Sequence, residues 1–410
     1  MSWVFLAVSM VFAVLVVNAY FPIRREPFTA ASFALGWIPG ELPLHVCTIE
    51  VVIAIAFAVD GAMRAWPGWV GLAIALASWA GMVRLAVVAH GAKALVDGAL
   101  EEATGGAISV VGVDPAPAWN NWWRLLIAVP LRLRAIRRIR NVDYWGDGNY
   151  RHKLDILTRR AGTADRAPVL VYIHGGAWVI GDKRQQGIPM MHELVQRGWL
   201  CVAVNYRLSP RATWPAHIVD CKRAVAWVRE HIAEYGGDPS FIAVSGGSAG
   251  GHLASLLALT PNEPEWQPGF EDLDTSVDAC VPFYGVYDMT GAPDRFGAYG
   301  PGGLDLLERL VMKTRYADNP LLFHRASPDR RVTATAPPMF VFYGTNDTLV
   351  PPEVARYFVA QLREASQAPV ASVELPRTQH AFDVLASIRC RHTTMGAVQF
   401  LEGMRVRVGR

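Results

Sequence analysis

Long apolar runs with few charges set the pattern of the first 90 residues. Residues 2–21 include no charged side chain, and about twenty apolar residues cross a bilayer core as one helix. A shorter run covers 44–59, and a third covers 68–88. We expect two or three transmembrane helices, with 44–59 as the one that could instead be a buried or interfacial helix. A cleaved signal peptide is the alternative for 2–21, but the basic n-region and a good cleavage site are missing.

The stretch 119–140 has a different character. Three tryptophans precede an apolar stretch in which six arginines are distributed. Such a segment suits the surface of an anionic membrane, and a solvated basic helix is the alternative. We therefore expect residues 91–140 to form a linker and an interfacial basic amphipathic segment.

Arginine positions predict the orientation of the chain in the membrane. Arg24 and Arg25 follow the first apolar run, and the basic segment follows the third. With three spans both clusters lie on one side, so the positive-inside rule predicts a cytoplasmic C-terminal part. With two spans the clusters fall on opposite sides, and an exported C-terminal part is the alternative.

From about residue 141 short β-branched runs alternate with helical stretches. This alternation predicts an α/β fold with a doubly wound, mostly parallel sheet that is buried on both faces. A long stretch rich in Gly and Pro, 291–336, predicts a lid insertion. The strands are expected at 168–173, 200–205, 241–245, 279–283, 338–342 and 371–375, and two intervening helices at 216–234 and 251–259.

Composition narrows the class of protein. Residues 1–90 carry eight charged side chains, whereas the other 320 residues carry 67, close to a soluble average of about one in four to five. The net charge of +3 argues against a nucleic-acid partner and against disorder. The five cysteines are scattered, and neither a zinc motif nor a nucleotide-binding glycine loop is found. We expect no metal and no cofactor.

Two glycine-rich loops follow expected strands. The loop 246–251 reads GGSAGG, a G-x-S-x-G turn that would expose the Ser248 hydroxyl between a strand and a helix. The loop 174–178 reads HGGAW, and its small residues let main-chain N–H groups converge as an oxyanion hole. We interpret His174 as a structural histidine that braces this loop.

An acid and a histidine follow two later strands. Asp347 comes after 338–342 and His380 after 371–375, so the chain order is Ser, Asp, His, as in α/β-hydrolases. Asp288 and Asp383 are rival acids. Asp383 lies only three residues past the histidine, so we interpret it as a residue that stabilises that loop.

These motifs together resemble the hormone-sensitive-lipase-like carboxylesterases of the α/β-hydrolase superfamily, over about residues 148–400. The motifs are HGGAW (174–178), NYRLSP (205–210), WPA (214–216), GGDP (236–239), GGSAGG (246–251), GTND (344–347) and QHAF (379–382). The resemblance implies Ser248 as nucleophile, Asp347 as acid and His380 as base. It implies oxyanion donors at the amides of Gly175, Gly176, Ala177 and Ala249, and we expect Trp178 in the substrate pocket.

The chain departs from the family pattern at two positions. The family often has glycine where Ala177 stands and Asp or Glu where Gly247 stands. The first 140 residues lie outside the resemblance and occupy the place where soluble relatives carry a cap over the site. The HGG-x-W motif also resembles arylformamidases and membrane-bound prenylcysteine methylesterases.

The sequence therefore predicts an α/β-hydrolase domain, 141–410, behind an α-helical transmembrane region. We interpret the protein as a membrane-anchored serine ester hydrolase that works through an acyl-enzyme, with an ester substrate and membrane lipid as partners. A formamidase-like amide hydrolase and a prenylcysteine methylesterase are the alternatives within enzymes. A catalytically silent binding module is a third alternative, which the complete triad disfavours.

Overall fold

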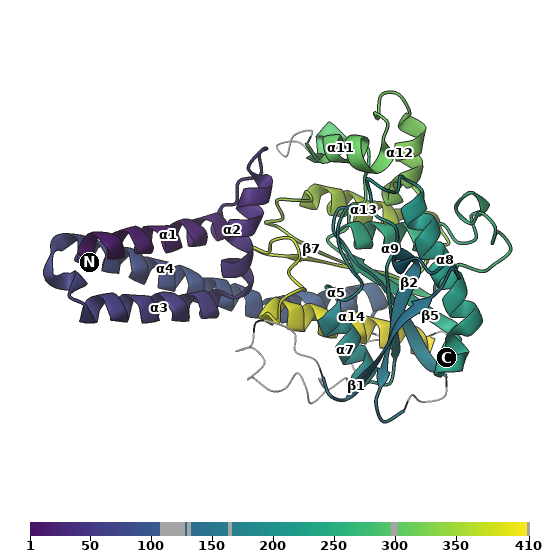
Figure 1. Ribbon diagram of the computed structural model, residues 1–410, viewed down its shortest axis with the longest axis horizontal. Helices are drawn as coiled ribbons and strands as arrows, with labels where there is room; N and C mark the ends of the chain where they lie inside the picture. The colour runs from purple at the N-terminus through teal and green to yellow at the C-terminus, as the bar shows by residue number, and fades with distance from the viewer. Residues whose placement is uncertain (107–127, 129–132, 163–165, 297–301, 408–410) are drawn as a thin grey trace.

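An elongated bundle of helices projects from an α/β part in the computed structural model (Figure 1). The structure describes residues 1–106, 128, 133–162, 166–296 and 302–407. Three helices form the bundle: α1 (Ser2–Tyr20), α3 (Pro43–Val59) and α4 (Trp66–His90). By length and composition, two helical segments of the described chain, Ser2–Tyr20 and Trp66–Thr104, could cross a membrane. A third span is possible if the bent pair α2 (Thr29–Glu41) and α3 counts as one.

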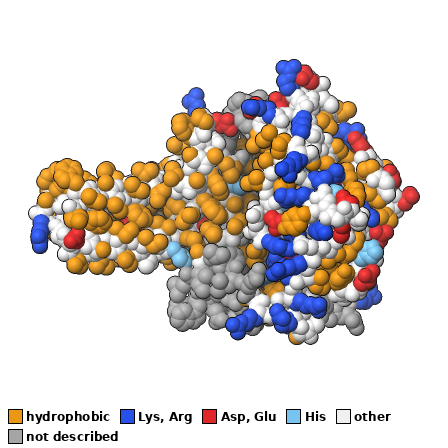
Figure 2. All heavy atoms as spheres, in the orientation of Figure 1, with side chains coloured by type: hydrophobic (Ala, Val, Ile, Leu, Met, Phe, Trp, Pro, Cys, Tyr) orange, Lys and Arg blue, Asp and Glu red, His pale blue; other side chains and the backbone are white. Residues whose placement is uncertain are grey.

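The surface of the bundle is apolar, whereas charged side chains gather on the α/β part (Figure 2). Outward-facing side chains such as Val14, Val52 and Val87 are each more than half exposed. The inside is close-packed, because a Cβ atom on Gly71 of α4 would lie 3.1 Å from the backbone of Leu6 on α1. An apolar outside with small residues between helices is the packing of membrane bundles.

Helix α2 lies where the bundle meets the α/β part. It makes an angle of 89° with α3, so it runs across the end of the bundle and not along it (Figure 1). Asn18 of α1 and Ser32 of α2 exchange two hydrogen bonds, Asn18 Nδ2 to the Ser32 carbonyl (2.7 Å) and Ser32 Oγ to Asn18 Oδ1 (2.8 Å). These buried bonds fix the start of α2 against the end of α1.

The α/β part is built on one eight-stranded sheet, with strand order β1-β2-β4-β3-β5-β6-β7-β8. β1 is antiparallel to β2, and β2 is antiparallel to β4. The six strands β3 to β8 run parallel to one another. This confirms the α/β-hydrolase fold with a mostly parallel sheet. The strands are β1 (Ile136–Asp143), β2 (Lys153–Arg159), β3 (Ala167–Ile173), β4 (Leu200–Val204), β5 (Gly237–Gly247), β6 (Ala279–Phe283), β7 (Met339–Gly344) and β8 (Val370–Leu375).

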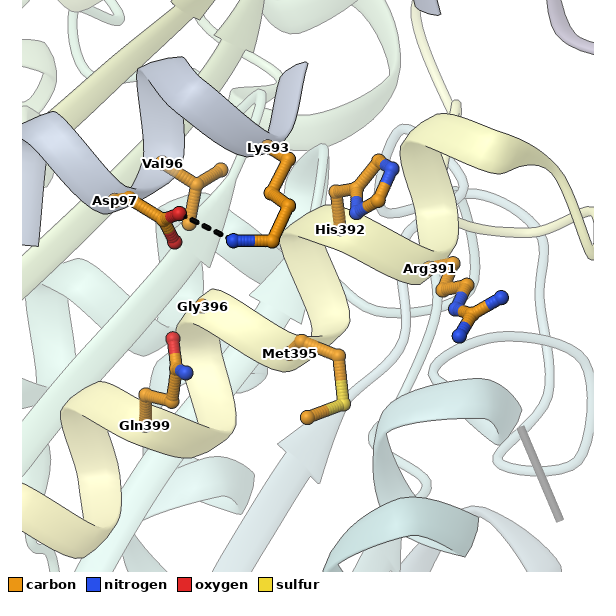
Figure 3. Close-up of a pocket in the computed structure, with 8 residues that line it drawn as sticks. All are labelled: Lys93, Val96, Asp97, Arg391, His392, Met395, Gly396 and Gln399. Atoms are coloured by element: carbon orange, nitrogen blue, oxygen red, sulfur yellow. Dashed lines mark hydrogen bonds and ion pairs between the residues drawn. The ribbon is translucent and has the colours of Figure 1, made fainter. Parts of the chain in front are cut away.

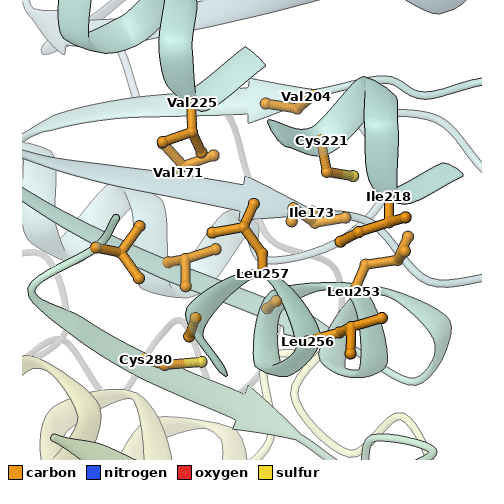
Figure 4. Close-up of a cluster of buried hydrophobic side chains, with 14 of the residues drawn as sticks. Val171, Ile173, Val204, Ile218, Cys221, Val225, Leu253, Leu256, Leu257 and Cys280 are labelled. Carbon is orange, nitrogen blue, oxygen red and sulfur yellow. The ribbon is translucent and has the colours of Figure 1, made fainter. Parts of the chain in front are cut away.

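Helices cover both faces of this sheet. On one face, α8 (Ala216–His231) and α9 (Ala249–Leu259) pack on alternate strand residues such as Val171 and Ile173 (Figure 4). Helix α13 (Pro352–Ala365) packs on β7 and β8 on the same face. On the other face lie α5 (Ala92–Thr104), α7 (Ile188–Gln196) and α14 (Ile388–Arg407). The strands are apolar on both sides because both faces are buried.

Two boundaries differ from the sequence-based expectation. The linker expected from residue 91 begins instead with α5, whose Val96 and Leu100 are buried in the second core with β8 and α14. The basic segment expected at 119–140 ends in the edge strand β1, so its last arginines belong to the sheet. These residues form a strand because they pair with β2 at the edge of the sheet, although their sequence pattern suits an amphipathic segment. Residues 119–127 and 129–132 lie outside the described residues.

The insertion expected as a lid, 291–336, contains several short helices. One of its backbone carbonyls, that of Val311, accepts a hydrogen bond from the Trp214 amide (2.9 Å), so the insertion packs on the segment after β4. The elements are α10 (Pro293–Phe296), α11 (Gly302–Leu306), the π-helical turn η7 (Leu307–Met312), α12 (Pro320–Ala326) and η8 (Pro328–Arg330). The remaining short turns are η1 (Ala62–Arg64), η3 (Tyr150–His152), η4 (Ile232–Tyr235) and η5 (Pro264–Trp266).

Candidate active site

The loop between β5 and α9 turns sharply at Ser248. The backbone there has φ 57° and ψ −124°, a conformation that L-residues rarely adopt and that costs about 1–3 kcal/mol. The turn needs glycine nearby, because a Cβ atom on Gly250 would lie 2.1 Å from the Ile173 carbonyl oxygen. The Ser248 side chain is half-buried at the N-terminus of α9. This is the strained strand-to-helix turn expected from the sequence.

His380 and Asp347 lie side by side beyond β8 and β7. The His380 Nδ1 atom lies 2.7 Å from Asp347 Oδ2, and both side chains are buried. The other oxygen of Asp347 accepts the amides of Leu349 and Val350, each at 2.8 Å. These bonds stabilise the carboxylate and hold it in one orientation toward the imidazole. Asp347 is therefore the carboxylate that pairs with His380.

The two rival acids have other partners. Asp288 accepts hydrogen bonds from the amide and hydroxyl of Thr290. Asp383 is buried and accepts a hydrogen bond from the Tyr284 hydroxyl. Burial raises the pKa of Asp383 to about 6. Neither carboxylate has a hydrogen bond to His380 among those that the structure describes.

The loop after β3 has three successive residues with positive φ: Gly176 (120°), Ala177 (50°) and Trp178 (59°). Its left-handed backbone would favour glycine at position 177, where this chain has alanine. The Gly175 amide donates to Gln186 Oε1 at 2.7 Å. Gly175 therefore departs from the role of oxyanion donor that the sequence predicted for it. The expected donors that remain are the amides of Gly176, Ala177 and Ala249, the last of these at the first position of α9.

Two residues of the same loop belong to the protein interior. The His174 ring stacks on Tyr206, with centroids 4.5 Å apart, and burial lowers its pKa to about 4. A neutral, stacked ring fits the structural role expected for it. Trp178 was expected in the substrate pocket, but it lies in the core and packs edge-on against His252, with centroids 5.1 Å apart. Its positive φ turns the indole down onto α9.

Tyr284 connects the serine turn with the histidine, and the sequence reasoning missed it. It directly follows β6, and its ring centroid lies 4.5 Å from that of His380. On the other side, a Cβ atom on Gly247 would lie 2.7 Å from the Tyr284 hydroxyl. Tyr284 thus fills the space that a side chain at position 247 would take. Its place after a strand end was the available signal.

Helix α2 also contributes to the site, which the sequence reasoning missed. The Phe33 ring lies edge-on to His380, with centroids 6.2 Å apart and planes at 80°. Trp37 stacks on Phe33 and donates its indole N–H to the Ala381 carbonyl oxygen at 3.0 Å. The apolar character of 29–40 was a signal for a helix, but nothing local indicates its contact with residues 344 positions later.

A separate groove lies between α5 and α14 (Figure 3). It holds none of the predicted site residues, and Lys93 within it forms an ion pair with Asp97 at 2.5 Å. Its lining residues are Lys93, Val96, Asp97, Arg391, His392, Met395, Gly396 and Gln399. In the described part of the chain, no cluster of three or more His, Cys, Asp or Glu could hold a metal ion.

Comparisons with known proteins agree with this arrangement. Residues 154–362 match the BD-FAE domain family. The chain is 44% identical to a probable carboxylic ester hydrolase, LipM, of Mycobacterium tuberculosis. That match covers 97% of this chain and 92% of LipM, so it includes the N-terminal helices.

Two further similarities concern the α/β part. A probable isoprenylcysteine alpha-carbonyl methylesterase of rice is 30% identical over 55% of this chain and 53% of that protein. The structure of the propionate-bound esterase Est2 from Thermogutta terrifontis is 27% identical, with a TM-score of 0.53. It covers 68% of this chain and 97% of Est2.

The sheet order, the serine turn at the end of β5 and the match to LipM over nearly the whole chain lead to one assignment. The chain belongs to the hormone-sensitive-lipase-like carboxylesterases of the α/β-hydrolase superfamily, and its α/β part carries the BD-FAE domain.

Proposed function

We propose that the protein is a serine hydrolase of carboxylic esters that works through an acyl-enzyme. The observation that carries the proposal is the buried 2.7 Å contact between His380 Nδ1 and Asp347 Oδ2, at the same sheet edge as the strained turn at Ser248. A carboxylate on Nδ1 keeps the proton there and leaves Nε2 as the base.

In this mechanism His380 takes the proton of the Ser248 hydroxyl as the serine oxygen attacks the acyl carbonyl. The charge on imidazolium is stabilised by Asp347. The tetrahedral oxyanion accepts hydrogen bonds from backbone amides of Ala249 and of the loop 176–177. The alcohol leaves with a proton from His380, and water, deprotonated by the same histidine, releases the acid.

The role of Ser248 as nucleophile is tested by removing its hydroxyl group. Ser248→Ala in the full chain is expected to abolish covalent labelling by a fluorophosphonate and to lower ester hydrolysis by about 10⁴-fold or more. His380→Ala added to this variant lowers the rate little further, because triad members act as a unit. Full labelling of the Ser248→Ala protein would overturn the assignment.

We further propose that α1, α3 and α4 anchor the enzyme in a membrane, with the α/β part in the cytoplasm. The apolar surface of the bundle supports the anchor. Arg24 and Arg25 lie at the end of the bundle that faces the α/β part, whereas the opposite end carries the turn Ala62–Arg64. More basic residues on the α/β side favour the cytoplasm for that side.

Cysteine accessibility tests this orientation. A cysteine introduced near Arg166 is expected to resist a membrane-impermeant thiol reagent in intact cells and to react after permeabilisation. Labelling without permeabilisation would mean that the α/β part is exported. The native cysteines of the α/β part are buried, so the background signal of the parent protein is low and can be measured directly.

A prenylcysteine methylesterase activity is the second candidate. Its support is the similarity to the rice methylesterase over 55% of this chain. Hydrolysis of a farnesylcysteine methyl ester, compared with that of a p-nitrophenyl ester of similar apolar size, distinguishes the two candidates. A strong preference for the methyl ester favours this second function.

A further inference from the structure

The N-terminal helices contact the two loops that carry Asp347 and His380. Asn346, on one side of Asp347, donates from Nδ2 to the Ala19 carbonyl oxygen at 2.8 Å. Thr348, on the other side, donates its hydroxyl to the Thr29 carbonyl oxygen at 3.0 Å. The end of α1 and the start of α2 therefore hold the Asp347 loop from both flanks.

The far end of α2 is fixed by a buried ion pair. Arg389 of α14 is 1% exposed and lies 3.1 Å from Glu41 Oε1, while the second Glu41 oxygen accepts the Ser387 hydroxyl at 2.9 Å. Arg389 also donates to the Gly40 carbonyl oxygen at 2.6 Å. Bonds at both ends hold α2 in place beside the site. Figure 1 shows α2 at the junction of the bundle and the α/β part.

The two faces of α2 are both apolar. Phe33 and Trp37 are half-buried and face the His380 loop. On the outside, Leu35 and Ile38 are 43% and 48% exposed, and Phe28 is 56% exposed. A helix that is apolar all round does not suit contact with water. Its angle of 89° to α3 lays it along the membrane surface when α3 crosses the bilayer.

From this arrangement we infer that the site takes esters with a long apolar group directly from the bilayer, and that Phe33 and Trp37 contact that group. The inference rests on the proposed esterase function. The apolar group leaves the lipid beside α2 and packs on the Phe33 ring, which brings the ester carbonyl toward Ser248. Each buried CH₂ group strengthens such binding about fourfold, so chain length is the readout.

The test uses the full chain reconstituted in phosphatidylcholine vesicles. It measures kcat/KM for p-nitrophenyl butyrate and for p-nitrophenyl palmitate. Phe33→Ala is expected to lower the ratio of long-chain to short-chain kcat/KM by about tenfold or more, because it removes the apolar contact. Val52→Ala truncates an apolar side chain on the outer surface of α3; it is the control and leaves the ratio unchanged.

Trp37→Phe separates positioning from binding. It keeps an aromatic ring but removes the N–H bond to Ala381, so it is expected to lower kcat/KM on both esters by a similar factor. If Phe33→Ala also lowers kcat/KM for both esters by an equal factor, Phe33 only braces His380, and the inference about the substrate is wrong. An unchanged ratio with unchanged rates would equally overturn it.

The route of entry has its own test. The palmitoyl ester is placed either in the vesicles that carry the enzyme or in separate vesicles. Entry from the bilayer predicts hydrolysis at least about tenfold faster when enzyme and ester share a vesicle. Equal rates would mean that the ester arrives through water. Fluorophosphonate labelling of Ser248 in the same sample reports the proposed serine chemistry, so its failure is distinguished from failure of this inference.

Discussion

At the scale of single residues, backbone strain and burial concentrate around the proposed triad. Ser248, Ala177 and Trp178 all have positive φ, which costs free energy that the surrounding packing must offset. Tyr284 lies at the centre of this region, in contact with His380 and with Asp383. One aromatic side chain thus occupies the space that an acidic residue would take at position 247.

The buried Asp383 predicts a pH dependence of stability. Its pKa in the folded state is raised by burial from 3.8 to about 6. Between these values the unfolded chain is ionised while the folded chain keeps its proton, so rising pH favours unfolding. Stability contributed by the protonated group is complete below pH 3.8 and lost as pH rises through 6. The shift corresponds to about 3 kcal/mol.

Asp383→Asn removes this titration but keeps an acceptor for the Tyr284 hydroxyl. The melting temperature of the wild-type chain minus that of the variant is expected to fall as pH rises from 4 to 7. Parallel melting curves across this range would show that Asp383 ionises in the folded state as it does in water. Detergent and salt are held constant, because both change the melting temperature.

At the scale of elements, α2 and α14 depend on each other through Glu41 and Arg389. Removing one partner of a buried pair costs about 3–5 kcal/mol because the other charge stays buried. Glu41→Ala is therefore expected to lower the melting temperature clearly and to expose the segment 21–28 to protease. Glu41→Leu combined with Arg389→Met should recover much of the loss, since no unpaired charge remains.

An exposed ion pair is the control for the buried pair of Glu41 and Arg389. Asp305 and Arg309 form an ion pair in which the side chains are 60% and 74% exposed, and such pairs contribute about 0–1 kcal/mol. Asp305→Ala should leave the melting temperature nearly unchanged. A Glu41→Ala protein as stable as this control would mean that α2 is not held by the buried pair.

At the scale of the whole molecule, the N-terminal helices contact the candidate site, and α5 completes a core of the α/β part. Helix α5 fills the face of the sheet near β8, where a Cβ atom on Gly396 would lie 2.2 Å from Val96 Cγ1. The end of α1 and helix α2 hold the loops that carry Asp347 and His380. Cutting the chain at residue 141 removes these contacts and also divides strand β1.

Residues 141–410 alone are therefore expected to aggregate, because the apolar face under α5 is exposed. Residues 92–410, which keep α5 and all of β1, should remain soluble in size-exclusion chromatography. Without α2 their activity on a short ester should fall about 100-fold, as a misplaced catalytic group commonly does. Full activity of 141–410 would contradict the structural role given to the N-terminal helices.

Local sequence patterns were enough to predict much of the structure of this protein. The strands around the site, the turn at Ser248 and the strand ends that carry Asp347 and His380 follow from β-branched runs and small residues within about ten positions. Parallel strands then bring their carboxyl ends to one edge, so the pairing of the acid with the histidine was predictable as well. The apolar runs likewise predicted the helices α1, α3 and α4.

Tertiary structure alone decided where α2 lies, that α5 belongs to the core and that the basic segment ends in β1. The contact of Phe33 with His380 joins residues 347 positions apart, and no periodicity in either segment encodes it. Local patterns record which face of an element is buried. They do not record what buries it, because that depends on the packing of the whole chain.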